Sequence, residues 1–413
     1  MRPRLFTVRK VLLFIVAMGI FGSMAYWLSI GAPLPGAGVP STADKIIFIS
    51  DRDGHPDLWM MDGTTGENAV ALTQDEATDR HPVFNAAGSE IAFVSEGRNG
   101  GVVPQIYTVD AKPGSKVLPL TNTSASKEQP VFGPEGRIFY LSAGKLSATD
   151  PASRETDQLF PEADEVKSLI GTEDSPGILA MGGIAQVSVS PDGKRYAAVI
   201  KTDAGQALMM VTPGEHAGSG ALLGVGKRIL CQFLNDGRLV ASFSDGSPLQ
   251  QPQPLYNEEM IEGLAVVHAE PLRQLPLPEG QFPIAIFDAQ GAAVSALPLP
   301  FGPDVMVVSP DGARVAVASA KSADSSKDKK DQPSFVGLAI LPLAEGAEQG
   351  AGRLFDQPAA SASWSPDGKK IAFASGKDIY SVPIDGSTPP VNLTQGKGTN
   401  SSPAWSPAKP VKK

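Results

Sequence analysis

Cysteine and histidine are scarce in this chain, and their scarcity narrows the chemistry open to it. Of 413 residues one is a cysteine, Cys231, and four are histidines. A single thiol excludes an intramolecular disulfide and a cysteine-type zinc site. Cys231 lies in the apolar run 229–233, where we expect a small buried hydrophobe.

The motifs of familiar catalytic sites are also missing. No Walker loop, G-x-S-x-G elbow or helix-opening G-x-G-x-x-G is present, and no two histidines have His-x-x-x-His spacing. We therefore predict no catalytic residue, no cofactor-binding residue and no metal ligand. His55 and His81, which we place in loops leading into strands, are the two histidines worth testing; the other two are His216 and His268. Asp51-Arg52-Asp53-Gly54 lacks the further ligands of a calcium loop, so a hairpin turn is favoured.

The charge is uneven along the chain. The net charge is −9, although basic residues cluster before residue 11 and in the last five positions. The body between them is therefore more acidic than the net charge indicates. An acidic surface repels phosphate backbones, which argues against nucleic acid as a partner.

Residues 11–30 contain no charged side chain. As a helix they would span about 30 Å, the thickness of the hydrocarbon layer. The basic stub 1–10 precedes them, so the positive-inside rule keeps the N-terminus in the cytoplasm. We predict a single-pass signal-anchor in the cytoplasmic (inner) membrane, a Gly- and Pro-rich linker over 31–44, and an extracytoplasmic or periplasmic domain beyond it. A signal peptide cleaved near Ser23-Met24-Ala25 is the alternative, and it also exports the domain.

Beyond the linker, helical periodicity is nearly absent and one unit recurs: an apolar run, a turn rich in Pro, Asp and Gly, and a second apolar run. The pattern predicts a β-hairpin, because Pro fixes φ, Asp bonds back to the backbone and Gly accepts positive φ. The clearest copies are Ser-Pro-Asp-Gly at 190–193, 309–312 and 365–368, and weaker copies end at Gly88, Gly136 and Gly237. An aromatic residue in the third strand and a Leu-Thr pair at the end of the fourth strand also recur.

A unit of about 40–50 residues is typical of a four-stranded propeller blade. The first run, 45–50, has no strand before it, whereas 402–407 repeats the first-strand motif and then stops. We expect these two ends to pair and close the ring. The sequence thus predicts an all-β propeller of about seven blades over 45–407, with six or eight as alternatives. Insertions are expected at 245–281, in the fifth blade, and at 321–333, and a basic tail at 408–413.

The chain resembles the TolB-type, WD40-like β-propellers through its Ser-Pro-Asp-Gly copies, the run Ile47–Gly54 and Asn392-Leu393-Thr394. The resemblance implies an envelope location, protein–protein binding and no cofactor. This chain departs from TolB itself, which would have six blades and a separate preceding domain. The partners of TolB are therefore not carried over to this chain.

We expect a non-enzymatic interaction scaffold that binds another envelope protein or membrane complex. The alternative is a propeller hydrolase, lactonase or small-ligand sensor that uses the central channel. Blade motifs hold hairpins together in proteins of many roles, so they do not decide between these functions.

Overall fold

The computed structural model describes residues 44–160, 183–202, 205–212, 219–254, 282–299, 301–319, 337–343 and 352–408. Strands dominate this part of the chain, and its helical segments are the two short 3-10 turns Arg98–Gly100 and Pro134–Gly136. Within the described ranges no helix is both long enough and apolar enough to cross a bilayer. The predicted span 11–30 lies outside them.

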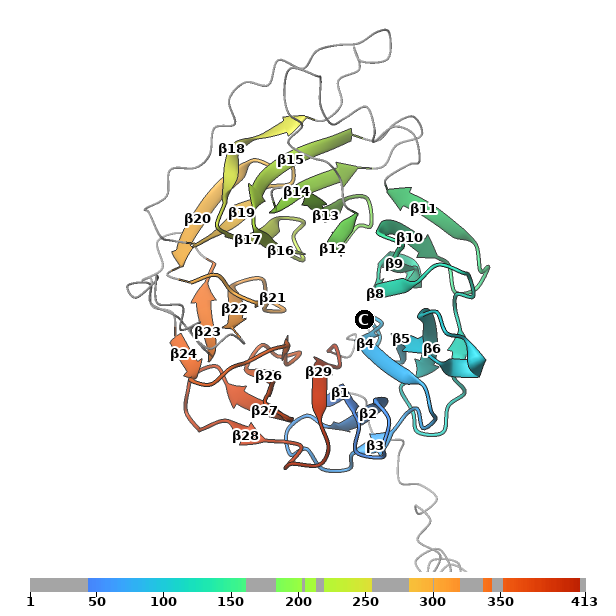
Figure 1. The fold of residues 1–413 in the computed structure, drawn as a ribbon. Helices are drawn as coiled ribbons and strands as arrows, with labels where there is room; N and C mark the ends of the chain where they lie inside the picture. The colour runs from blue at the N-terminus through green and yellow to red at the C-terminus, as the bar shows by residue number, and fades with distance from the viewer. Residues whose placement is uncertain are drawn as a thin grey trace, which may run out of the picture. The chain divides into compact units, whose positions relative to one another are not determined.

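The strands form seven antiparallel sheets arranged as a ring of blades, which confirms the predicted all-β propeller (Figure 1). The first strand of each blade lies toward the middle of the ring. In that order the first three blades are β29 (Asn400–Trp405), β1 (Lys45–Ser50), β2 (Asp57–Asp62), β3 (Val70–Ala71); β4 (Thr78–Phe84), β5 (Glu90–Glu96), β6 (Gln105–Asp110), β7 (Leu118–Pro119); and β8 (Lys127–Phe132), β9 (Ile138–Ser142), β10 (Lys145–Thr149), β11 (Thr156–Phe160).

The remaining four blades follow the same order. They are β12 (Ile184–Val189), β13 (Tyr196–Thr202), β14 (Gly205–Thr212), β15 (Ser219–Gly226) with β18 (Ser247–Pro254); β16 (Arg228–Phe233), β17 (Leu239–Ser244), β19 (Phe282–Phe287), β20 (Ala293–Leu299); β21 (Val305–Val308), β22 (Arg314–Ser319), β23 (Gly337–Pro342), β24 (Gly352–Phe355); and β25 (Ala362–Trp364), β26 (Lys370–Ser375), β27 (Asp378–Pro383), β28 (Val391–Asn392).

Each junction between neighbouring blades holds one hydrophobic cluster, and the seven clusters together join every blade to the next. The second strands supply both sides of their blade. In β5, Ile91 and Phe93 pack toward the first blade, whereas Ala92 and Val94 pack toward the third. Because alternate side chains of a strand point to opposite faces, a strand covered on both faces is a continuous apolar run.

The predicted Pro-Asp-Gly turns join the first and second strands of six blades. In the sixth blade the hydroxyl of Ser309 donates to Asp311 at 2.5 Å and accepts the backbone N–H of Arg314 at 2.9 Å. Gly312 has φ 69°, a conformation that favours glycine. The turn is therefore fixed by local bonds.

The ring closes as the sequence predicts. In β29, Trp405 pairs with Ile46 of β1, and the strand completes the first blade from the other end of the described chain. The Ser406 N–H donates to the Lys45 carbonyl at 2.8 Å. Closure in this way gives the inner edge of β1 a partner strand.

The insertion into the fifth blade differs from the prediction in one respect. We treated 245–281 as a loop of that blade, but its first part forms β18, which pairs with β15 of the fourth blade. The fourth blade therefore has five strands. β15 has eight residues, and a strand of that length would otherwise present a long unpaired edge. Residues 255–281 and the predicted insertion 321–333 lie outside the described residues.

Candidate functional site

The strand order gives the propeller two unlike faces. Tight turns join the first and second strands on one face, which we call the turn face. The opposite ends of the strands form the loop face, where the second strand joins the third and each blade leads to the next. The connections 51–56, 72–77, 97–104 and 120–126 lie there. Binding residues concentrate on loops held by a rigid scaffold, so the loop face is the candidate functional surface.

The recurrent Leu-Thr ending of the fourth strand has a structural role on this face. In three blades the threonine hydroxyl accepts the backbone N–H of the second residue of the third strand. The bonds are Leu58 to Thr73 (2.8 Å), Ile106 to Thr121 (3.0 Å) and Ile379 to Thr394 (3.0 Å). These threonines tie the outer connection of each blade to its third strand.

An arginine after the second strand of the first blade is held on three sides. Arg52 donates from Nε to the hydroxyl of Ser50 (2.9 Å) and from Nη2 to the amide oxygen of Asn400 (3.1 Å). Its guanidinium lies 5.1 Å from the ring centre of Phe48 and 4.6 Å from that of Trp59. Cation–π contact therefore adds to the hydrogen bonds.

The second blade repeats this arrangement with a carboxylate. Arg98 donates from Nε to the hydroxyl of Ser95 (3.0 Å) and from Nη2 to both oxygens of Asp79 (3.1 and 3.0 Å). It also bonds to Asp75 and lies over the ring of Tyr107 at 5.5 Å. We call this group the Arg98 clamp. It anchors the loop 97–104 to the connection between the first and second blades.

The clamp continues into a pair of carboxyl groups. Asp79 is 1% exposed, and Thr73 donates to it at 2.7 Å. The Thr73 hydroxyl also lies 3.1 Å from Asp57, which is 2% exposed. Burial raises the pKa of Asp57 to about 6, and the negative charges of Asp79 and Asp75 act in the same direction.

The third blade has a lysine at the matching place. Lys127 stands three residues before Pro130, as Asp79 stands before Pro82 and Asn400 before Pro403. It is 3% exposed, and its ammonium group donates to neutral acceptors: Thr123 Oγ1 (2.6 Å), the Ala125 carbonyl (3.0 Å) and Ser142 Oγ (2.9 Å). Burial lowers the pKa of Lys127.

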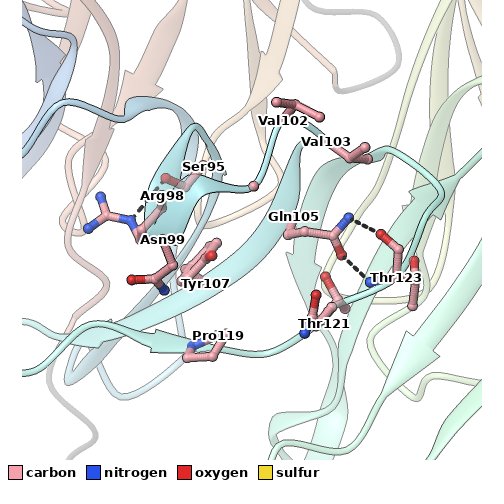
Figure 2. Close-up of a pocket in the computed structure, with 12 residues that line it drawn as sticks. Ser95, Arg98, Asn99, Val102, Val103, Gln105, Tyr107, Pro119, Thr121 and Thr123 are labelled. Atoms are coloured by element: carbon pink, nitrogen blue, oxygen red, sulfur yellow. Dashed lines mark hydrogen bonds between the residues drawn. The ribbon is translucent and has the colours of Figure 1, made fainter.

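A recess of about 270 Å³ opens on the loop face of the second blade (Figure 2). The loop 97–104 and the connection 120–126 form its walls. Gln105 fixes the second wall, because its side chain accepts the Thr123 N–H (3.1 Å) and donates to the Thr123 carbonyl (2.9 Å). Val102 and Val103 lie at the rim, and Val102 is 84% exposed.

A second recess, of about 460 Å³, lies where the first and seventh blades meet. Arg52, Glu67, Asn68, Gln395 and Lys397 are among its lining residues. Its lining is mainly polar, and it has no counterpart to the exposed Val102. We therefore place the candidate binding site in the recess of the second blade.

The residues singled out from the sequence lie apart from one another. His55 is exposed in the hairpin 51–56, and Asp51 there accepts the Gly54 N–H through its carbonyl (2.9 Å), which confirms a turn. His81 lies inside β4, and its placement in a loop was wrong. Strand pairing shifts register between Arg80 and Val83, so a β-bulge gives His81 a φ of 52°.

The same bulge recurs before a proline in two other first strands. Gln129 has φ 51° and Ser402 has φ 52°, each at a register shift. Within the described ranges, no group of three or more His, Cys, Asp or Glu side chains is placed to hold a metal ion. His216 and His268 lie outside those ranges. Cys231 is buried, as expected, and burial raises the pKa of its thiol to about 12.

Sequence reasoning missed the Arg98 clamp, Lys127 and the recess. The available signal was an arginine two residues after Ser50 and three residues after Ser95, together with aromatic residues in the flanking strands. Only folding brings Asp79 of β4 to Arg98.

Comparison with known proteins gives similarity of fold at low sequence identity. No protein-family model matches the chain, and no curated protein matches it either. TolB from Acinetobacter baumannii is 16% identical with a TM-score of 0.44, covering 90% of this chain and 69% of its own. The β-propeller domain of Cps50 (Swd1) from Myceliophteria thermophila is 12% identical with a TM-score of 0.45 and covers 80% and 86%.

Hydrazine synthase from Kuenenia stuttgartiensis is 15% identical with a TM-score of 0.44, and the match covers 74% of this chain and 76% of that one. The propeller assignment rests on the strand order and the closed ring of this chain.

Proposed function

We propose that this protein is a non-enzymatic, membrane-tethered scaffold whose propeller binds another envelope protein outside the cytoplasm. The anchor is the apolar segment 11–30, and the binding surface is the loop face of the second blade. A tether of this kind raises the effective concentration of the propeller near partners in the same membrane.

The observation that carries this proposal is the exposed apolar rim of the recess. Val102 is the most exposed of the large hydrophobic side chains in the described ranges, and it stands on a loop whose base is anchored by the Arg98 clamp. An exposed side chain on an anchored loop loses little conformational entropy on binding. Polar groups such as Gln105 and Thr123 lie beside it, which suits a small apolar anchor with a polar surround.

The test is a gentle membrane pull-down with the tagged full chain and the variant Val102→Asp. Burying a valine is worth about 1.5–3 kcal/mol, so we expect recovery of a stoichiometric membrane partner to fall at least about tenfold. Val294→Asp is the matched control, because Val294 is 48% exposed on the outer strand β20.

Equal recovery with Val102→Asp and the unchanged chain would contradict the proposed surface. Recovery of chaperones alone, together with tight retention of a metal by the purified chain, would contradict the scaffold function and favour the enzyme or sensor alternative.

A further inference from the structure

The hydroxyl of Thr73 faces two carboxyl groups with one proton to give. One of its lone pairs accepts the Leu58 N–H at 2.8 Å. Its oxygen lies 2.7 Å from Asp79 Oδ2 and 3.1 Å from Asp57 Oδ1. A hydroxyl has a single donor hydrogen, so it bonds to only one carboxylate at a time. If both carboxyl groups were ionised, one of these two contacts would bring the Thr73 oxygen against a carboxylate oxygen with no hydrogen between them.

The clamp decides which carboxyl group is ionised. Both oxygens of Asp79 accept from Arg98 Nη2, and this ion pair stabilises the charged form. Among the described residues no cation pairs with Asp57, which otherwise accepts only a long bond from the Asp75 N–H at 3.4 Å. The missing hydrogen is therefore best supplied by Asp57.

We propose that the fold binds one acid proton on Asp57, which donates to Thr73 while Thr73 donates to Asp79, and that loss of this proton weakens the tie between the start of β2 and the β3–β4 connection. The proton belongs to the loop face itself and does not depend on the proposed partner.

The charged groups around Asp57 favour its protonated form. Asp75 faces it from the β3–β4 connection and Asp79 from β4, whereas the cation Arg98, on the β5–β6 loop, is paired with those two carboxylates. Burial is the largest cause of the raised pKa of Asp57, about 6, and the Thr73 and Asp75 hydrogen bonds oppose it. Burial also raises the pKa of Asp79, against the effect of Arg98.

The seventh blade provides an internal comparison. Asp378 accepts the Thr394 hydroxyl at 2.6 Å, and that hydroxyl accepts the Ile379 N–H, as in the first blade. Within the described ranges no second carboxylate bonds to Thr394, because the position matching Asp79 is Asn400. Asp378 also accepts from Gly396 N–H (2.8 Å) and Asn392 (3.0 Å), and its pKa is lowered despite burial. Without a second carboxyl group beside the threonine, the same threonine–aspartate hydrogen bond therefore holds an ionised aspartate.

The sign of the effect on stability follows from proton binding. The folded chain binds the Asp57 proton up to about pH 6, whereas the unfolded chain releases it near the ordinary value of 3.8. Between those values the native state holds more protons, so stability falls as the pH rises and is highest on the acid side.

The experiment measures denaturant unfolding of the full chain from pH 4.5 to 7.5, with hydrogen exchange of peptides over 51–57 at the same pH values. We expect stability to fall through about pH 6 and exchange of 51–57, corrected for intrinsic rates, to increase. Asp79→Asn copies the Asn400 arrangement and should lower the pKa of Asp57 and remove the transition. Asp57→Asn, whose amide donates to Thr73 at every pH, should remove it too.

Asp378→Asn is the matched control and should leave the transition near pH 6 in place. A 13C titration of labelled aspartate carboxyls, assigned with Asp57→Asn, gives the pKa of Asp57 directly. A value at or below 3.8, or the same transition in the Asp57→Asn chain, would overturn the proposal. If Asp79→Asn does not fold, the Asp57→Asn chain and the 13C titration still decide.

Discussion

Two tryptophans occupy the same position of the repeat, and we expect the same substitution, Trp to Phe, to change the stability of the chain differently at each. Trp364 and Trp405 each end a first strand, each precedes Ser-Pro, and each is 7% exposed. The indole N–H of Trp364 donates to the Val307 carbonyl at 3.0 Å. The indole N–H of Trp405 is buried without a partner in the described structure.

Replacing either residue by Phe removes a similar amount of packing. Trp405→Phe also removes a buried unpaired donor, which relieves about 1–3 kcal/mol. Trp364→Phe instead leaves the Val307 carbonyl without its donor, at a cost of about 1–3 kcal/mol. We therefore expect Trp364→Phe to destabilise the chain by at least about 2 kcal/mol more than Trp405→Phe.

Urea unfolding of the full chain, followed by far-UV circular dichroism, measures this difference. The two variants should share a slope with the unchanged chain and differ in midpoint. Equal midpoints would refute the reasoning, because they would mean that Trp405 has a partner equivalent to Val307. A lower midpoint for Trp405→Phe would show that ring closure depends on the full indole.

Two further substitutions test close packing and burial of charge. A Cβ at Gly66, where φ is 72°, would lie 2.3 Å from the Leu393 carbonyl oxygen, whereas Gly386, with φ 64°, has open space around it. In urea unfolding, Gly66→Ala should therefore destabilise the chain by at least about 1 kcal/mol more than Gly386→Ala. Equal losses of stability would contradict the close contact between the first and seventh blades. Burial lowers the pKa of Lys127, so the native state releases this proton at a lower pH than the unfolded state does. The stability of the unchanged chain relative to Lys127→Met should therefore rise as the pH approaches 10.5. A difference in stability between the two chains that stays constant from pH 8 to pH 10.5 would contradict this.

The propeller was predictable because each hairpin of its repeat is determined by residues close together in the sequence. The turns at Gly193, Gly312 and Gly368 need only neighbouring residues to form, so each hairpin is visible in the sequence. The doubly covered second strands are visible as continuous apolar runs. Ring closure was predictable because 45–50 lacks a first strand and 402–407 lacks a second.

The fifth strand of the fourth blade was not predictable in the same way. β18 is rich in Pro, which argues against a strand, and it pairs with β15 of the fourth blade although it follows β17 of the fifth blade in the chain. The Arg98 clamp was missed for a related reason. Arg98 lies 19 residues from Asp79, and no local rule links an arginine after one strand to an aspartate in the preceding strand.

The candidate site depends on one variable position within a constant framework. The residue three before the first-strand proline is Asp79 in the second blade, Lys127 in the third and Asn400 in the first. The backbone around it is held in each case by the same bulge, with φ near 52° at His81, Gln129 and Ser402. A propeller junction is therefore made acidic, basic or neutral without a change of fold. The acidic junction is the one whose Asp79 holds Arg98 at the base of the loop 97–104. The proton proposed on Asp57 is therefore joined, through Thr73 and Asp79, to the arginine that anchors the loop carrying the exposed Val102.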